Sequence, residues 1–157
     1  MTKAKISRPS ISKADKNWYS EHEISLIKKA AFDKGFENFT QVHLKEYTQN
    51  IVKVQLKASD FFEKSSVECS VNFKQIRLKA TSINSFELIF IMDENQFLSK
   101  EIYRSVYECG LEFIENSFES DLSITFIYMP FSGNLNDNEF LLNGFGLTYD
   151  PFREAKS

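Results

Sequence analysis

The sequence contains little cysteine. Its two cysteines, Cys69 and Cys109, lie far apart among 157 residues and form no CxxC pair. A chain of this length can bury roughly two-thirds of its unfolded surface in a core, so it does not need a disulfide framework. The spacing of cysteines and histidines indicates no zinc site. We therefore expect two reduced thiols in an intracellular protein.

Long apolar runs and an excess of positive charge are also missing. No stretch approaches the ~20 apolar residues of a membrane helix, and the N-terminal segment MTKAKISRPSISKADK has no apolar region of the kind that a signal peptide needs. The net charge of −3 argues against a wholly basic surface for nucleic acid. We expect a cytoplasmic or nuclear protein, with no membrane partner and with nucleic acid disfavoured as a partner.

Residues for catalysis and metal binding are sparse. The two histidines, His22 and His43, belong to no motif that would activate a serine or cysteine nucleophile. The acidic loop from Asn134 to Glu139 lacks the residue register of a calcium loop. Two of the 22 acidic residues could meet in space as a glycosidase-type pair, an alternative that the sequence leaves open. We predict no catalytic, cofactor or metal site.

Phenylalanine, in contrast, is abundant. The chain has sixteen, which raises the aromatic fraction to 15%. Aromatic rings bury large areas, so we expect most of them in the core of a sheet that is backed by helices. The alternative is a surface on which nucleic-acid bases stack.

The composition changes near residue 18. Residues 1–17 carry five basic residues against one acid and almost no large apolar side chain, which predicts a disordered basic tail.

Residues 18–157 are assigned to a single α+β domain. Ser20 and Glu23 form a capping-box pattern, so we predict a helix over about 20–34. Five alternating or apolar runs follow, at 41–48, 50–57, 66–73, 76–83 and 86–93. They predict an antiparallel sheet, although not every run need be a strand.

The second half has sharper patterns. The run 86–93 is apolar on both sides of the pleat, as a central strand would be. Ser99 can cap the helix that follows. We then predict a buried strand at 123–130, a short helix at 136–144 with an Asn/Asp start and a glycine stop, and a closing strand at 144–151.

One charged face distinguishes the helix after Ser99. At about 100° per residue, the charged side chains fall within one third of its circumference, and the apolar ones fall opposite. The charged set is Lys100, Arg104, Glu108, Glu112 and Glu115, and the apolar set is Ile102, Val106, Cys109 and Phe113. Pairs on an exposed helix face contribute only ~0.3–0.5 kcal/mol each, so stability gives little reason for the arrangement. A solvated face and a recognition surface both remain open.

The order of strand, helix, strand, helix, strand is typical of the acetyltransferase fold. In that fold, a glycine-rich turn at a helix N-terminus holds the pyrophosphate of acetyl-CoA. The five glycines of this chain never form the required Q/R-x-x-G-x-G/A, and the connection DENQFL before Ser99 carries acids that would repel a pyrophosphate. We expect an acetyltransferase-like (GNAT-like) mixed sheet flanked by helices, without the cofactor loop and without a cofactor.

From about Ser82 to Pro151, the chain resembles ornithine decarboxylase antizyme. The likeness lies in an apolar strand, a loop ending in Ser-Lys-acid, a helix, a strand, and a short helix that leads into LLNGFGLTYDP. Lys100 and Glu108 occupy the places of two family residues that contact the decarboxylase, and Arg104 and Glu112 share their helix face. We hypothesise that these four side chains form a protein-binding surface.

The resemblance implies a non-enzymatic inhibitor. Such a protein binds ornithine decarboxylase monomers as a heterodimer, blocks their homodimerisation and presents them to the proteasome without ubiquitin, which lowers polyamine synthesis. Two alternatives belong to other classes: an acyl-CoA-dependent N-acetyltransferase, and an RNA- or protein-binding module that uses exposed aromatic side chains on a sheet together with the basic tail.

Overall fold

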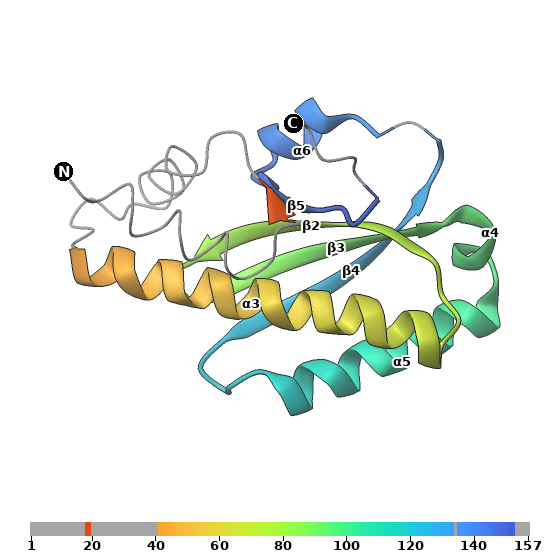
Figure 1. The fold of residues 1–157 in the computed structure, drawn as a ribbon, viewed down its shortest axis with the longest axis horizontal. Helices are drawn as coiled ribbons and strands as arrows, with labels where there is room; N and C mark the ends of the chain where they lie inside the picture. Colours follow the sequence, from red (N-terminus) through yellow and green to blue (C-terminus); the bar gives the residue numbers. More distant parts are fainter. Residues whose placement is uncertain (1–17, 20–40, 134, 153–157) are drawn as a thin grey trace.

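The protein has an α+β fold in which an open mixed sheet is flanked by helices (Figure 1). The computed structural model describes residues 18–19, 41–133 and 135–152. The strands are β1 (Trp18–Tyr19), β2 (Phe73–Ser82), β3 (Ser85–Asp93), β4 (Ser123–Phe131) and β5 (Leu147–Tyr149). The helices are α3 (Gln41–Glu68), α4 (Glu94–Phe97), α5 (Lys100–Ser117) and α6 (Asp137–Leu142).

The sheet has the strand order β1-β5-β2-β3-β4. β2 and β3 form an antiparallel hairpin, and α5 connects β3 to β4, which pairs with β3 in parallel. After β4 the chain passes through α6 to β5, which pairs antiparallel with β2 at the other side of the sheet. Two residues of β1 extend the sheet beyond β5. Among the described strands, β4 therefore has one unpaired edge.

The predicted strands at 41–48 and 50–57 are wrong, because residues 41–68 form the single helix α3. The predicted strand at 66–73 is also wrong except for its last residue: 66–68 end α3, 69–72 form no strand, and β2 begins at Phe73. The stretch Val52-Lys-Val-Gln-Leu56 alternates like a strand, but the buried apolar positions of the whole segment follow a helical period of three and four. These apolar positions are Tyr47, Ile51, Val54, Ala58, Phe61 and Phe62. No glycine or proline interrupts these 28 residues, so nothing breaks a helix whose apolar side is buried against the sheet.

Serine and threonine residues, which resemble turn signals in the sequence, are accommodated inside α3. Thr48 Oγ1, Ser59 Oγ and Ser65 Oγ donate hydrogen bonds to the carbonyl oxygens of Leu44, Gln55 and Phe61, at 2.9, 2.9 and 2.6 Å. These bonds to the fourth residue back satisfy the hydroxyls without opening the helix. For that reason the turn-like pairs at Ser59-Asp60 and Ser65-Ser66 do not end it.

The elements predicted in the second half are confirmed. The strands β2, β3, β4 and β5 fall within or close to the predicted runs, and α5 and α6 occupy the predicted helices. The short helix α4 was not predicted; it begins where Asp93 Oδ1 accepts a hydrogen bond from the Asn95 N–H at 2.9 Å. The predicted basic tail at 1–17 and the predicted helix at 20–34 lie outside the described residues.

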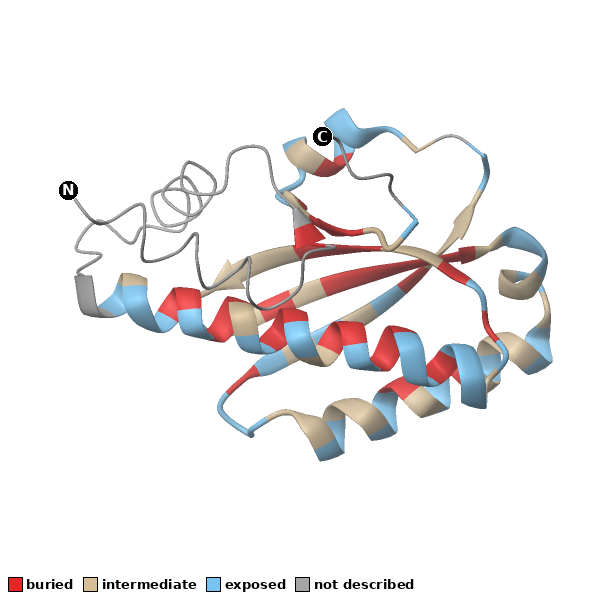
Figure 2. Cartoon of the chain, viewed as in Figure 1, coloured by how far each residue is buried: buried red, intermediate tan, exposed pale blue. Residues whose placement is uncertain are grey.

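The main core lies between the sheet and the helices α3 and α5 (Figure 2). Phe61 of α3 is at its centre, with ring centroids 5.3 Å from Phe90, 5.2 Å from Phe113 and 5.1 Å from Phe126. Among the described phenylalanines only Phe152 is exposed. The predicted role of these rings in a core is therefore confirmed for the described part of the chain.

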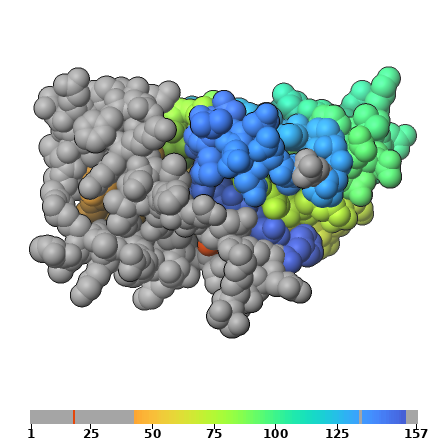
Figure 3. All heavy atoms as spheres, turned by 90° about the horizontal axis from the view of Figure 1, so that it is seen from above, coloured from red at the N-terminus to blue at the C-terminus, as the bar shows by residue number. Residues whose placement is uncertain are grey.

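A smaller core lies on the opposite face of the sheet, under α6. Phe140 and Phe145 pack on Ile89 and Ile91 of β3. The buried guanidinium of Arg77 lies over the Phe140 ring at 4.4 Å, and its Nη2 bonds to Asp137 Oδ1 at 2.6 Å. This arrangement holds α6 on the sheet, and α6 is seen among the blue atoms at the centre of Figure 3.

Candidate protein-binding face on helix α5

Helix α5 has a well-defined start. Ser99 is extended at the N-cap position, and its Oγ accepts a hydrogen bond from the Ile102 N–H at 3.4 Å. Glu101 lies in the first turn, where a negative charge interacts favourably with the helix dipole. These features fix the position of Lys100, which immediately follows the cap.

The inner side of α5 is held firmly against the sheet. Val106 and Gly110 are buried, and Ile102, Cys109 and Phe113 pack at the edge of the main core. At Gly110, an added Cβ would collide with the Tyr128 hydroxyl of β4. The helix can therefore approach β4 this closely only because residue 110 has no side chain.

The outer side of α5 carries the predicted binding residues. Lys100, Arg104, Glu108 and Glu112 are all exposed, as is Glu115 further along. No ion pair in the described part of the chain uses any of them; the two that occur there join Lys53 to Glu119 and Arg77 to Asp137. The structure thus presents these four side chains to solvent on a helix whose other side is anchored.

Three of the four predicted residues come together around a shallow hollow. The hollow measures about 400 Å³ and is lined by Glu101, Arg104, Ser105, Glu108, Cys109 and Glu112. Lys100 does not line it, and lies one turn before Arg104. The hollow contains one basic and three acidic side chains and is widely open, so its chemistry suits contact with a charged protein surface better than enclosure of a small molecule.

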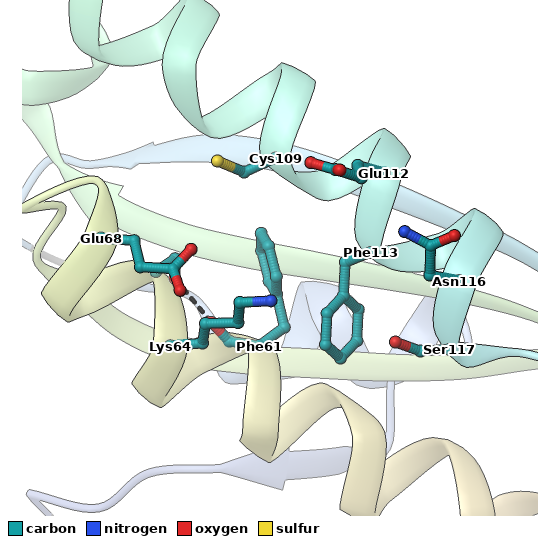
Figure 4. A pocket seen from close by; sticks show the side chains of 9 residues that line it. Phe61, Lys64, Glu68, Cys109, Glu112, Phe113, Asn116 and Ser117 are labelled. Atoms are coloured by element: carbon teal, nitrogen blue, oxygen red, sulfur yellow. Dashed lines mark hydrogen bonds between the residues drawn. The ribbon is translucent and has the colours of Figure 1, made fainter.

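A second hollow separates α5 from α3 (Figure 4). It measures about 290 Å³, with Phe61, Lys64 and Glu68 on the α3 side and Cys109, Glu112, Phe113, Asn116 and Ser117 on the α5 side. Lys64 Nζ lies 5.9 Å from the centroid of the Phe113 ring. Glu112 borders both hollows, so α3 contributes ionic side chains next to the predicted face.

The two cysteines meet beside this face. Cys69, just after α3, has its Sγ 3.1 Å from Cys109 Sγ, and both are free thiols. The hydrogen bond with Cys69, followed by burial, raises the pKa of the Cys109 thiol to about 11. Cys109 is therefore protonated at neutral pH and is a poor nucleophile.

Sequence reasoning missed the contribution of α3 to this region. Lys64, Glu68 and Cys69 were assigned to strands or their connections, so nothing placed them beside α5. If residues 41–68 are predicted as a helix, Phe61, Lys64 and Glu68 fall on neighbouring turns of one side. The closeness of Cys69 and Cys109 has no signal in the spacing of the two residues.

The connection before α5 differs from a phosphate-binding turn. It folds as α4, with Asp93 at its cap and Glu94 in its first turn. In the described part of the chain, no group of three or more His, Cys, Asp and Glu side chains is placed to hold a metal ion. None of the described helices is long and apolar enough to cross a membrane.

No protein-family model, curated protein or solved structure matches this chain.

Proposed function

We propose that this protein is a non-catalytic inhibitor that binds a partner subunit through the outer face of α5. Following the resemblance to antizymes, the partner is an ornithine decarboxylase monomer. In this proposal the heterodimer replaces the decarboxylase homodimer, and the captured subunit is delivered to the proteasome without ubiquitin. The acetyltransferase-like identity of the fold belongs to the same proposal. The observation that carries it is a row of exposed charges, without ion pairs among the described residues, on a firmly anchored helix.

Several charges on α5 are placed where they do not stabilise the helix. Lys100 lies at the N-terminal end, where the dipole favours a negative charge, and Glu112 and Glu115 lie in the C-terminal half, where it favours a positive one. Four residues apart, Lys100 and Arg104 repel each other, as do Glu108 and Glu112. Each such placement costs a few tenths of a kcal/mol. Arg104 and Glu108, which are also four residues apart, attract each other, and Glu101 suits the first turn, so the charges together add little stability to the free helix. Charges that add little stability to the free protein support a role in contact with a partner.

The row also has a direction. Its first turns carry Lys100 and Arg104, and its later turns carry Glu108, Glu112 and Glu115. A partner must present acidic groups to one end and basic groups to the other, which fixes the orientation of docking and speeds association. Because the contact is ionic at its rim, binding should weaken as salt is added.

Charge reversal on α5 tests the proposal. We expect Lys100→Glu and Glu108→Lys to reduce inhibition of ornithine decarboxylase at least tenfold, measured by titrating each variant into the active enzyme. Both residues are exposed, so thermal unfolding should change little. Lys100→Glu should hold or slightly raise the stability, because it places an acid in the first turn.

Matched reversals on α3 serve as controls. Lys45 and Glu63 are exposed on that helix, away from the α5 face, so Lys45→Glu and Glu63→Lys should inhibit like the unchanged protein. If Lys100→Glu and Glu108→Lys are folded and inhibit fully, the α5 face is not the binding surface. If the unchanged protein neither binds nor inhibits the decarboxylase, the assigned partner is wrong.

A further inference from the structure

An exposed apolar stripe on α5 adjoins the basic end of the ionic face. Tyr107 and Leu111 are 47% and 53% exposed, and Tyr103 and Ile114 beside them are half-buried. At about 100° per residue these four side chains fall within about 80° of the helix circumference. The Tyr103 and Tyr107 rings stack with their centroids 6.4 Å apart. We define this set as the α5 stripe.

The α5 stripe faces outward past the edge of the sheet that β4 forms. Cys109 contacts Cys69 next to α3, so that side of α5 faces α3, and the stripe lies on the opposite side. α3 packs over β2, whereas α5 lies on β4, where Gly110 meets Tyr128 and Phe126. In Figure 1, α5 and β4 accordingly form the lower border of the described elements.

The edge of β4 next to this stripe is open and uncharged. Among the described strands β4 pairs only with β3, and its sequence SITFIYMPF contains no charged residue. Natural proteins commonly protect such an edge with lysine, proline or a bulge, because its free N–H and C=O groups can pair with another strand. Here Pro130 blunts one end, and Ile127 at the middle of the strand is 39% exposed.

The open edge and the α5 stripe share one centre. Ile127 is the middle residue of β4, and the stripe from Tyr103 to Ile114 is centred between Glu108 and Cys109. Gly110, next to that centre, packs on Phe126 and Tyr128, which flank Ile127. A two-fold axis through Ile127 would therefore also pass close to the middle of the stripe. A surface with this property can bind a copy of itself.

We infer that β4 and α5 form the interface of a homodimer, in which β4 pairs antiparallel with β4 of a second copy. Ile127 would meet Ile127 of the other copy at the axis, and the two sheets would become continuous. The helices α5 would run antiparallel, so that Tyr103 comes level with Ile114 of the other copy and Tyr107 comes within one residue of the level of Leu111.

The charges favour a second copy as the occupant. In the antiparallel arrangement, the turns that carry Lys100 and Arg104 in one α5 face the turns that carry Glu112 and Glu115 in the other, and Arg104 comes within two residues of the level of both acids. The exposed apolar side chains bury one another at the centre, while Glu108 lies about 60° round the helix from Leu111, towards the rim. The stripe adjoins the ionic face at Lys100 and Arg104, but the inference rests on the apolar side chains and the open edge of β4, not on the proposed function.

Sedimentation of the purified full-length chain tests the inference. We expect a species of twice the 18.3 kDa chain mass. Leu111→Glu and Ile127→Lys place charges at the centre of the interface, and each should shift the chain to the monomer at the same concentration. Leu142 on α6 is 83% exposed and belongs neither to β4 nor to the α5 stripe, so Leu142→Glu is the matched control and should leave the dimer intact.

Cross-linking locates the axis. In a Cys69→Ser/Cys109→Ser background, Ile127→Cys should form a disulfide-linked dimer with diamide as oxidant, whereas Leu142→Cys should not. A chain that stays monomeric at high concentration would overturn the inference. So would a dimer that persists in both Leu111→Glu and Ile127→Lys, or one that fails to cross-link through Ile127→Cys.

Discussion

At the scale of single residues, Gln55 has the least favourable environment in the core. It is fully buried on α3, and neither its side-chain nitrogen nor its oxygen has a hydrogen-bond partner in the described part of the chain. A buried amide without partners costs about 1–3 kcal/mol. The amide of Gln55 therefore lowers the stability of the core and gains no hydrogen bond within the described residues.

We predict that Gln55→Met stabilises the protein by about 1–3 kcal/mol, because methionine has a similar shape and no polar group to desolvate. Chemical denaturation followed by circular dichroism measures the change. Gln55→Ala is the control, and should destabilise by leaving a cavity. Lower stability of Gln55→Met would show that the amide makes a favourable interaction.

The thiol of Cys109 gives a second prediction at this scale. Its pKa is raised to about 11 by the hydrogen bond with Cys69 and by burial. In the unfolded chain, the pKa of a cysteine thiol is about 8.5. The folded state thus holds its proton more tightly, and this contribution to stability is complete below about pH 8.5 and is lost as the pH rises towards 11.

We predict that iodoacetamide labels Cys109 of the folded protein at pH 8 about 100-fold more slowly than an unperturbed thiol, because only the thiolate reacts. Mass spectrometry of the labelled peptide measures the rate. Cys69→Ser should accelerate the labelling by removing the first cause of the raised pKa. Labelling of folded Cys109 at the rate of a free cysteine would contradict the account.

At the scale of elements, the close contact of α5 with β4 depends on Gly110. The Tyr128 hydroxyl is buried without a hydrogen-bond partner in the described residues, and it lies where a Cβ at position 110 would be. A side chain at residue 110 would push α5 away from the sheet. This contact sets the position of both the charged face and the α5 stripe.

We predict that Gly110→Ala destabilises the protein by about 1–3 kcal/mol, as an overpacked core residue does, despite the higher helix propensity of alanine. In a Tyr128→Phe background the cost should fall, because the colliding oxygen is gone. A double-mutant cycle from denaturation curves measures this coupling. Strictly additive effects would mean that residue 110 and Tyr128 do not contact each other.

The elements also show what the sequence could predict. Strand β3, helix α5 with its Ser99 cap and helix α6 with its Asn136 cap were predictable, because each has a local signal in its caps or its apolar pattern. Residues 41–68 were mistaken for strands because β-branched residues alternate within a helical pattern and hydroxyl side chains imitate turns. Their helical conformation is favoured by burial against the sheet, which is a tertiary effect.

At the scale of the whole molecule, the order of strands was beyond sequence reasoning. Nothing local shows that β5 crosses to β2, or that β4 is left at an edge. The exposure of Lys100, Arg104, Glu108 and Glu112 followed from helical periodicity alone. Their neighbours Lys64 and Glu68 depend on how α3 packs on α5, and so required the structure.

The two proposed surfaces divide α5 between them. The apolar side remains packed on the protein's own sheet, the α5 stripe is available to a second copy, and the ionic face is available to a partner subunit. Because Leu111 lies between Lys100 and Arg104 around the helix, the dimer would cover the basic end of the ionic face and would compete with a partner subunit. In the proposed function, this ionic face captures a decarboxylase subunit.

Co-precipitation with ornithine decarboxylase, with enzyme activity read in the same tube, tests that claim most directly. We predict that the protein retains the decarboxylase as a heterodimer and that activity falls in proportion to the amount bound, with both effects lost in Lys100→Glu/Glu108→Lys. Retention with undiminished activity, or equal capture by the charge-reversed variant, would contradict it.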